Sequence, residues 1–95
     1  MELFIPLTNF YEAIEDDVRI GTTHISLYIA LLQQWNINGG INPIQIVRSE
    51  IMKAAKISAR CTYNKCINNL QEFGYITYQP SRNPFICSTV FLRGL

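Results

Sequence analysis

The sequence predicts a small α+β domain in which the helices come first and a β-hairpin comes last. Residues 58–73 carry apolar side chains at intervals of three and four, as in a helix buried along one side. After Gly74 the pattern changes to β-branched and aromatic residues at positions 75–78, which indicates a strand. A second strand-like run over residues 85–92 follows a loop with two prolines. A helix that leads directly into a hairpin is typical of an α+β fold.

The composition is that of one folded domain with an uneven charge distribution. The chain has 95 residues, of which 48% are hydrophobic, and this is enough for one core. Residues 1–47 contain one basic and five acidic residues, a net charge of −4, whereas residues 48–95 contain seven basic and two acidic residues, a net charge of +5. The asymmetry predicts an anionic partner for the second half. Ordinary surface charge is the alternative interpretation.

The cysteines predict neither a disulfide framework nor a zinc site. Cys61, Cys66 and Cys87 are odd in number, and no two of them have the spacing of a CxxC motif. Cys61 and Cys66 are expected on opposite sides of one helix. Free thiols are typical of a reducing compartment, so we expect a cytoplasmic protein. We expect no signal peptide and no membrane span, because the longest apolar segment, residues 25–32, is too short.

A short helix is predicted near the N-terminus. Asn9 and Glu12 have the spacing of a capping box, in which the N-cap and N3 side chains satisfy each other's backbone N–H groups. This spacing predicts a helix over residues 10–16 after an extended lead-in. Phe10 and Ile14 would then face inward, with Tyr11 as a further candidate for this side.

The main domain is predicted to span residues 21–95, after an N-terminal extension of residues 1–20. Its first helix is expected to be capped by Thr22 or Thr23 and to run to about Trp35. This helix is apolar on most sides, which favours a central packing position.

A strand, a short helix and a tight turn are predicted to precede the long helix. Residues 44–47 have the composition of a strand. Ser49 is a suitable N-cap for a helix over residues 50–55. Residues 56–58 then form a three-residue turn, and Ser58 is the expected N-cap of the long helix.

The exposed side of the long helix carries cations and amides. With a step of about 100° per residue, Cys61, Asn64, Lys65 and Asn68 form a stripe opposite the apolar one, and Arg60 flanks it. Such side chains can hydrogen-bond to base edges and phosphates in a major groove. A solvated polar face is the alternative interpretation. The tip of the predicted hairpin is also polar and basic: Ser81, Arg82, Asn83.

The order of these elements resembles the winged helix-turn-helix family. A short helix, a tight turn, a second helix and a hairpin follow one another over about residues 23–92. The resemblance is carried by Ser49-Glu50-Ile51, Lys56-Ile57-Ser58, Thr62-Tyr63, Ile67, Leu70 and Phe73-Gly74-Tyr75-Ile76. The turn lacks the glycine often found there, so Lys56 or a neighbour must take the conformation of that glycine, at a cost of about 1–2 kcal/mol if the conformation is left-handed. Compared with the family pattern, the chain has one extra residue between Ser58 and Thr62. The sequence therefore allows two neighbouring positions for the first turn of the second helix.

The resemblance implies sequence-specific binding of double-stranded DNA, without a cofactor or metal, by a small transcriptional regulator. A recognition helix over about residues 58–73 would enter the major groove, and a wing over about residues 79–85 would lie on the backbone or in a minor groove. A homodimer formed through residues 1–17 is compatible with this expectation. The implied DNA-binding residues are Lys56, Ser58, Arg60, Thr62, Asn64, Lys65, Asn68, Ser81, Arg82 and Asn83.

Two other functions remain as alternatives. Winged helices also serve as protein docking modules, and a DNA-binding accessory factor in replication or mobile-element transfer would have the same features. An enzyme is not expected, because His24 is the only histidine and has no nucleophile-and-base pattern around it. No glycine-rich phosphate loop is present, and no small-molecule ligand is indicated.

Overall fold

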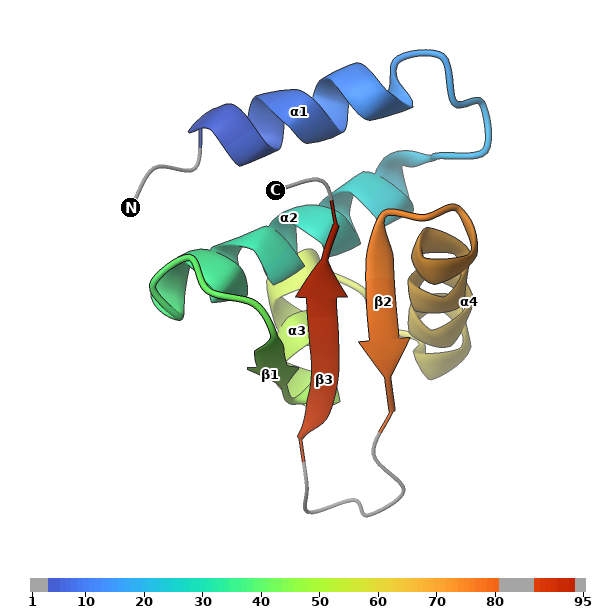
Figure 1. Ribbon diagram of the computed structural model, residues 1–95. Helices are drawn as coiled ribbons and strands as arrows, with labels where there is room; N and C mark the ends of the chain where they lie inside the picture. The colour runs from blue at the N-terminus through green and yellow to red at the C-terminus, as the bar shows by residue number, and fades with distance from the viewer. Residues whose placement is uncertain (1–3, 81–86, 94–95) are drawn as a thin grey trace.

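The computed structural model describes residues 4–80 and 87–93 and confirms an α+β fold (Figure 1). The described residues form four helices and one three-stranded antiparallel sheet. In chain order the elements are α1 (Phe4–Ile14), α2 (Thr22–Ile37), β1 (Ile44–Ile46), α3 (Arg48–Ala55), α4 (Arg60–Glu72), β2 (Ile76–Gln79) and β3 (Ser88–Leu92).

The sheet has the strand order β1–β3–β2, so the last strand lies in the middle. Ile44 of β1 and Tyr78 of β2 both pair with Val90 of β3. The antiparallel pairing of β2 with β3 confirms the predicted hairpin. The predicted basic tip, residues 81–83, lies outside the described residues.

One hydrophobic core joins the sheet to the helices. Leu27 and Leu31 of α2 are fully buried, which confirms the central position predicted for this helix. Figure 1 shows α2 and α3 behind the sheet and α4 beside β2. The inward side chains of the strands complete this core: Ile44, Ile46, Ile76, Val90 and Leu92.

The first helix is longer than predicted and begins earlier. It starts at Phe4, so Asn9 lies inside the helix and the predicted capping box is wrong. Pro6 falls in the first turn, where a missing N–H costs no hydrogen bond, and therefore it does not delay the helix. Phe10 and Ile14 are buried as predicted, whereas Tyr11 is 45% exposed.

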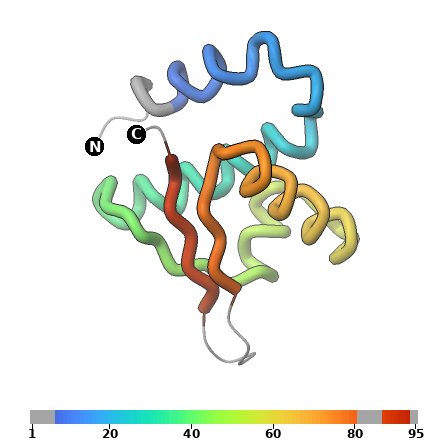
Figure 2. The backbone as a smooth tube through the Cα atoms, turned by 45° about the vertical axis from the view of Figure 1, so that its right-hand side comes forward, coloured from blue at the N-terminus to red at the C-terminus, as the bar shows by residue number. Residues whose placement is uncertain are grey.

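A stacked aromatic pair holds α1 against α2. The rings of Phe10 and Tyr28 lie 3.8 Å apart and are nearly parallel, with 2° between their planes. Figure 2 shows α1 crossing over α2, away from β1 and α3. The division of the chain at residue 20 stays a prediction, although α1 contributes Phe10 to the common core.

The start of α2 also differs from the prediction. The N-cap is Gly21, not Thr22 or Thr23, and the helix continues past Trp35 to Ile37. The backbone N–H of Gly21 donates to Nδ1 of His24 over 3.0 Å. A histidine at the N3 position therefore does what the glutamate or glutamine of a capping box usually does.

Candidate nucleic-acid interface

The connection between α3 and α4 consists of residues 56–59. Lys56 has a left-handed backbone conformation, with φ 62° and ψ 37°, so it is the residue that takes the place of the glycine often found in this turn. The N–H of Ile57 donates to the carbonyl of Met52 over 2.9 Å, so the end of α3 is closed by a backbone hydrogen bond. Ile57 is buried, and it anchors the connection in the core.

A side chain from α2 also supports this connection. The hydroxyl of Ser26 donates to the carbonyl of Ala55, the last residue of α3. The terminal carbonyl groups of a helix lack partners within the helix, so this bond satisfies one of them. The C-terminal end of α3 is therefore attached to α2 at Ala55.

The start of α3 is not capped as predicted. Val47, rather than Ser49, is the N-cap, and α3 begins at Arg48. β1 ends at Ile46, so only Val47 separates the strand from the helix. The carbonyl of Val47 accepts the N–H of Ile51, which closes the first turn without a side-chain cap.

The helix α4 begins at Arg60, two residues after the predicted N-cap Ser58. Its N-cap is Ala59, whose backbone is extended and whose side chain cannot accept a hydrogen bond. Ile57 is buried and Ala59 is extended, so the helix starts only at Arg60. Within the described part of the chain, the first three N–H groups of α4, at residues 60–62, have no acceptor.

The buried and exposed sides of α4 are those that the spacing predicts. Tyr63, Cys66, Ile67 and Leu70 are buried, and Phe73 just beyond the helix is half-buried. The seven candidate residues described by the structure are all exposed: Lys56, Ser58, Arg60, Thr62, Asn64, Lys65 and Asn68. None of the seven side chains has a hydrogen bond or an ion pair within the described residues.

The structure brings most of these residues to one surface. Asn64, Lys65 and Asn68 lie on the side of α4 opposite the core, together with Cys61. Thr62 lies seven residues before Asn69, so it shares the flank of the helix that faces α2 and not the centre of the exposed side. The candidates Ser81, Arg82 and Asn83 lie outside the described residues.

Two cations that the site prediction omitted lie on α3. Arg48 and Lys53 are exposed, and neither forms an ion pair within the part of the chain that the structure describes. Residues 48–69 carry five basic residues and one acidic residue, a net charge of +4. The sequence showed this charge run, but it did not show which helix faces would present it. Glu72 adds a negative charge at the C-terminal end of α4, so the positive charge is greatest around the beginning of this helix.

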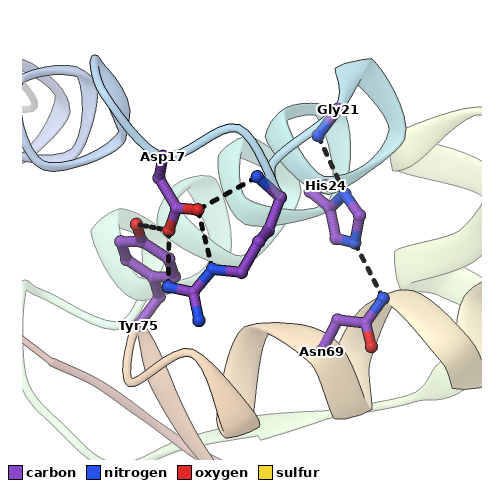
Figure 3. A network of polar contacts seen from close by, with 6 residues as sticks. Asp17, Gly21, His24, Asn69 and Tyr75 are labelled. Carbon is purple, nitrogen blue, oxygen red and sulfur yellow. Dashed lines mark hydrogen bonds and ion pairs between the residues drawn. The ribbon is translucent and has the colours of Figure 1, made fainter.

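A polar network ties the segment between α1 and α2 to the end of α4 (Figure 3). Two nitrogens of the Arg19 guanidinium each donate to a carboxylate oxygen of Asp17 over 2.8 Å. The hydroxyl of Tyr75 donates to Asp17 over 2.6 Å. Arg19 also lies 4.0 Å above the ring of Phe73, a cation–π contact. Hydrogen bonds from Arg19 and Tyr75 hold the pKa of Asp17 well below its usual range.

A hydrogen bond from β2 to α4 fixes the base of the hairpin. The backbone N–H of Tyr78 donates to the side-chain oxygen of Gln71 over 2.6 Å. This bond satisfies a backbone group on the edge of the sheet. The hairpin therefore leaves the core at a position set by α4.

A metal site, a membrane span and a ligand pocket each require particular features of the described residues. No group of three or more histidine, cysteine, aspartate or glutamate side chains in these residues could hold a metal ion. No helix within the described ranges is long and apolar enough to cross a membrane. A groove of about 550 Å³ between α2 and α3 has no ionisable side chain in its described lining: Thr22, Ile25, Ser26, Ile29, Ala30, Gln33 and Ala54.

Comparison of the chain with protein-family models, with curated proteins and with solved structures gives no match. The assignment of a function therefore depends on the residues and their geometry.

Proposed function

We propose that this protein is a winged helix-turn-helix protein that binds double-stranded DNA. In this interpretation α3, residues 56–59 and α4 form the helix-turn-helix, and β2, β3 and the loop between them form the wing. The short connection, the exposed second helix and the antiparallel hairpin that follows it support the proposal.

The observation that carries the proposal is the state of the first two turns of α4. Within the described ranges, their exposed cations and amides have no partners and the first three backbone N–H groups have no acceptor. A helix N-terminus with free N–H groups and nearby cations is suited to a phosphate. The amides next to it are suited to base edges, because asparagine can pair with adenine through two hydrogen bonds.

Each residue of the site then has a proposed role. Asn64 and Asn68 contact base edges, and Lys65 contacts a guanine or a phosphate. Arg60 and the N–H groups of α4 bind the phosphate backbone at the edge of the groove. The remaining candidates position the protein on the backbone from the turn, the flank of α4 and the wing: Lys56, Ser58, Thr62, Ser81, Arg82 and Asn83.

The biological role in this proposal is transcriptional regulation or an accessory role in replication or element transfer. A single small module gives limited specificity, so a homodimer formed through residues 1–17 is part of the proposal. Exposed apolar side chains favour protein docking as the second candidate function. Val18, Ile37 and Ile41 are 99%, 67% and 64% exposed, respectively.

The proposal is tested by titrating a fluorescent mixed-sequence duplex with the full chain at two salt concentrations. For four or five phosphate contacts, the affinity should fall about 10²–10³-fold between about 50 and about 200 mM salt. The variant Lys65→Ala/Asn68→Ala should bind much more weakly, and its salt dependence should be lower by about one contact.

A matched control is Asn9→Ala/Arg93→Ala, which removes the same numbers of charges and amides. Asn9 and Arg93 are exposed and lie together near α1 and the end of β3, away from the proposed interface. The control should bind like the wild type. If the folded wild-type chain binds no duplex at low salt, the DNA proposal is wrong and protein docking becomes the leading function.

A further inference from the structure

The side chain of His24 contacts both the beginning of α2 and the flank of α4. Its Nδ1 accepts the N–H of Gly21 over 3.0 Å, and its Nε2 lies 3.1 Å from the side-chain amide nitrogen of Asn69 (Figure 3). Asn69 directly follows the proposed base-contacting residue Asn68 and lies four residues after Lys65. The histidine therefore contacts the helix that carries the proposed DNA interface.

The contact at Nδ1 defines the tautomer of the neutral ring. A neutral imidazole that accepts at Nδ1 carries its proton on Nε2 and donates there. A half-turn of the Asn69 amide brings its oxygen to this position as the acceptor, because the two ends of an amide have nearly the same shape. With this orientation, neutral His24 makes a hydrogen bond at each nitrogen.

A proton on Nδ1 would end this arrangement. Both ring nitrogens of the imidazolium are donors, so Nδ1–H would face the N–H of Gly21, and the cap of α2 would be lost. The new positive charge would also lie near Lys65. Protonation therefore breaks the link at Gly21, whereas Nε2–H can still donate to Asn69.

The charged groups around the ring come from two elements. Lys65 on α4 disfavours a positive ring, and Asp17 in the segment between α1 and α2 favours it. Arg19 reaches the same region through Phe73, whose ring centroid is 6.4 Å from that of His24, and Glu72 lies close enough to affect Arg19. Burial, followed by Lys65, lowers the pKa of His24 below its ordinary value of 6.5.

We propose that His24 is a positioning residue for α4, which it joins in the neutral form to the N-terminus of α2, and that its protonation breaks this link at Gly21. The inference rests on the proposed function in so far as α4 is the helix that reads DNA. Base contacts tolerate displacements of only about 0.5 Å, so a shift of α4 affects base recognition more than it affects phosphate binding.

The first test needs no DNA. Because the chain has a single histidine, its ring signals in an NMR titration of the full chain have one assignment. The backbone amides of α4 and the side-chain amide of Asn69 should shift with the same midpoint as the ring, below pH 6.5. If these amides stay unchanged while His24 titrates, the inference is overturned.

The second test compares substitutions of His24. Glutamine at N3 can accept the N–H of Gly21 and donate to Asn69, so His24→Gln keeps both contacts without titrating. His24→Ala loses both contacts. Asn69→Ala keeps the cap and loses only the contact to α4, so it serves as the second variant if His24→Ala does not fold.

The measured quantity is a ratio of two affinities. The first is the affinity for a duplex that was selected for binding to the wild type, and the second is the affinity for a mixed-sequence duplex. His24→Ala and Asn69→Ala should reduce this ratio about tenfold at pH 7, the effect of about one lost base contact, with an unchanged salt dependence. His24→Gln should keep the ratio, and only the wild type should lose it as the pH falls below 6.5. Equal ratios for His24→Ala and His24→Gln would overturn the inference.

The two arms separate this inference from the DNA proposal. If the chain binds no duplex but the amides of α4 titrate with the same midpoint as the His24 ring, the DNA function is overturned and the contact between His24 and α4 is supported. A chain that binds duplex DNA without the shared titration supports the DNA function and overturns the role of His24.

Discussion

Lys56 combines a structural requirement with a proposed binding role. Its left-handed backbone closes α3, a conformation that costs a residue with a side chain about 1–2 kcal/mol. Its ammonium group is exposed beside the beginning of α4 and has no ion pair within the described residues. The residue is therefore unfavourable for stability and favourable for an anionic partner.

Substitution of Lys56 should separate these two effects. Lys56→Gly should stabilise the fold by about 1 kcal/mol, because glycine adopts the left-handed conformation without steric cost. It should also weaken DNA binding, because one cation is lost. Urea unfolding and duplex titration measure the two effects.

Lys56→Ala is the matched control, since it loses the same charge but keeps the left-handed strain. It should weaken DNA binding to the same extent without a gain in stability. If the two variants are equally stable, the strain does not reside at this residue.

At the scale of elements, the segment between α1 and α2 connects the N-terminal helix to the end of α4. Asp17 receives hydrogen bonds from Arg19 and Tyr75, and Arg19 covers Phe73. Phe10 of α1 lies against Tyr75 as well as Tyr28. The position of α1 is therefore linked, through Phe10 and Tyr75, to the residues that follow α4.

The Asp17 network should make stability depend on pH in the acidic range. The folded-state pKa of Asp17 is lowered from 3.8 by its hydrogen bonds, so the unfolded chain takes up the proton first. The stabilisation is complete above the unfolded pKa of about 4 and is lost as the pH falls toward the folded value.

The variant Asp17→Asn isolates this contribution from those of the other carboxylates. It should be less stable than the wild type at pH 7, and the difference should shrink as the pH falls below about 4. Unfolding by denaturant at a series of pH values measures the difference. A difference that is constant with pH would contradict this assignment.

The attachment of α1 should depend on Phe10. Phe10→Ala should destabilise the fold by about 2–4 kcal/mol and should speed hydrogen exchange in α1, because the buried ring is lost from its stack on Tyr28. Glu12→Ala is the control in the same helix, since Glu12 is exposed, and it should change stability by less than about 0.5 kcal/mol. Equal effects of the two changes would contradict the packing role of Phe10.

At the scale of the whole molecule, charge is separated between the two ends of the fold. The exposed acidic residues Glu12, Glu15 and Asp16 lie in and just after α1, whereas the cations of residues 48–65 lie on α3, the turn and α4. Figure 1 shows α1 crossing above α2, away from α3. A polyanion would therefore be attracted to the α3–α4 side and repelled by α1.

Cys61 provides a probe for the surface that meets this polyanion. Cys61 is exposed on α4, and Cys66 is buried with a pKa raised by burial. In a chain with Cys87→Ser, Cys61 should therefore react rapidly with a thiol reagent, and Cys66 should react only on unfolding.

Duplex DNA at low salt should slow the reaction of Cys61 by about tenfold or more, and high salt should restore the rate. The variant Lys65→Ala/Asn68→Ala should show no such protection. Full reactivity of Cys61 in a saturated complex would mean that DNA binds another face of the protein.

Local sequence patterns determined the elements whose signals lie within a few residues. The intervals of Tyr63, Ile67 and Leu70 marked the buried side of α4, and Gly74, with φ 90°, marked the end of this helical region. The same intervals identified the exposed side, because a helix has a fixed period.

Only the tertiary structure decided where the helices start and how distant segments meet. The N-caps Gly21, Val47 and Ala59 have no side-chain acceptor of their own, so no residue signal could mark them. The pairing of β1 with β3 and the contact of His24 with Asn69, 45 residues apart, depend on packing of the whole chain. Periodicity describes neighbours along the chain, whereas these contacts follow from burying one shared core.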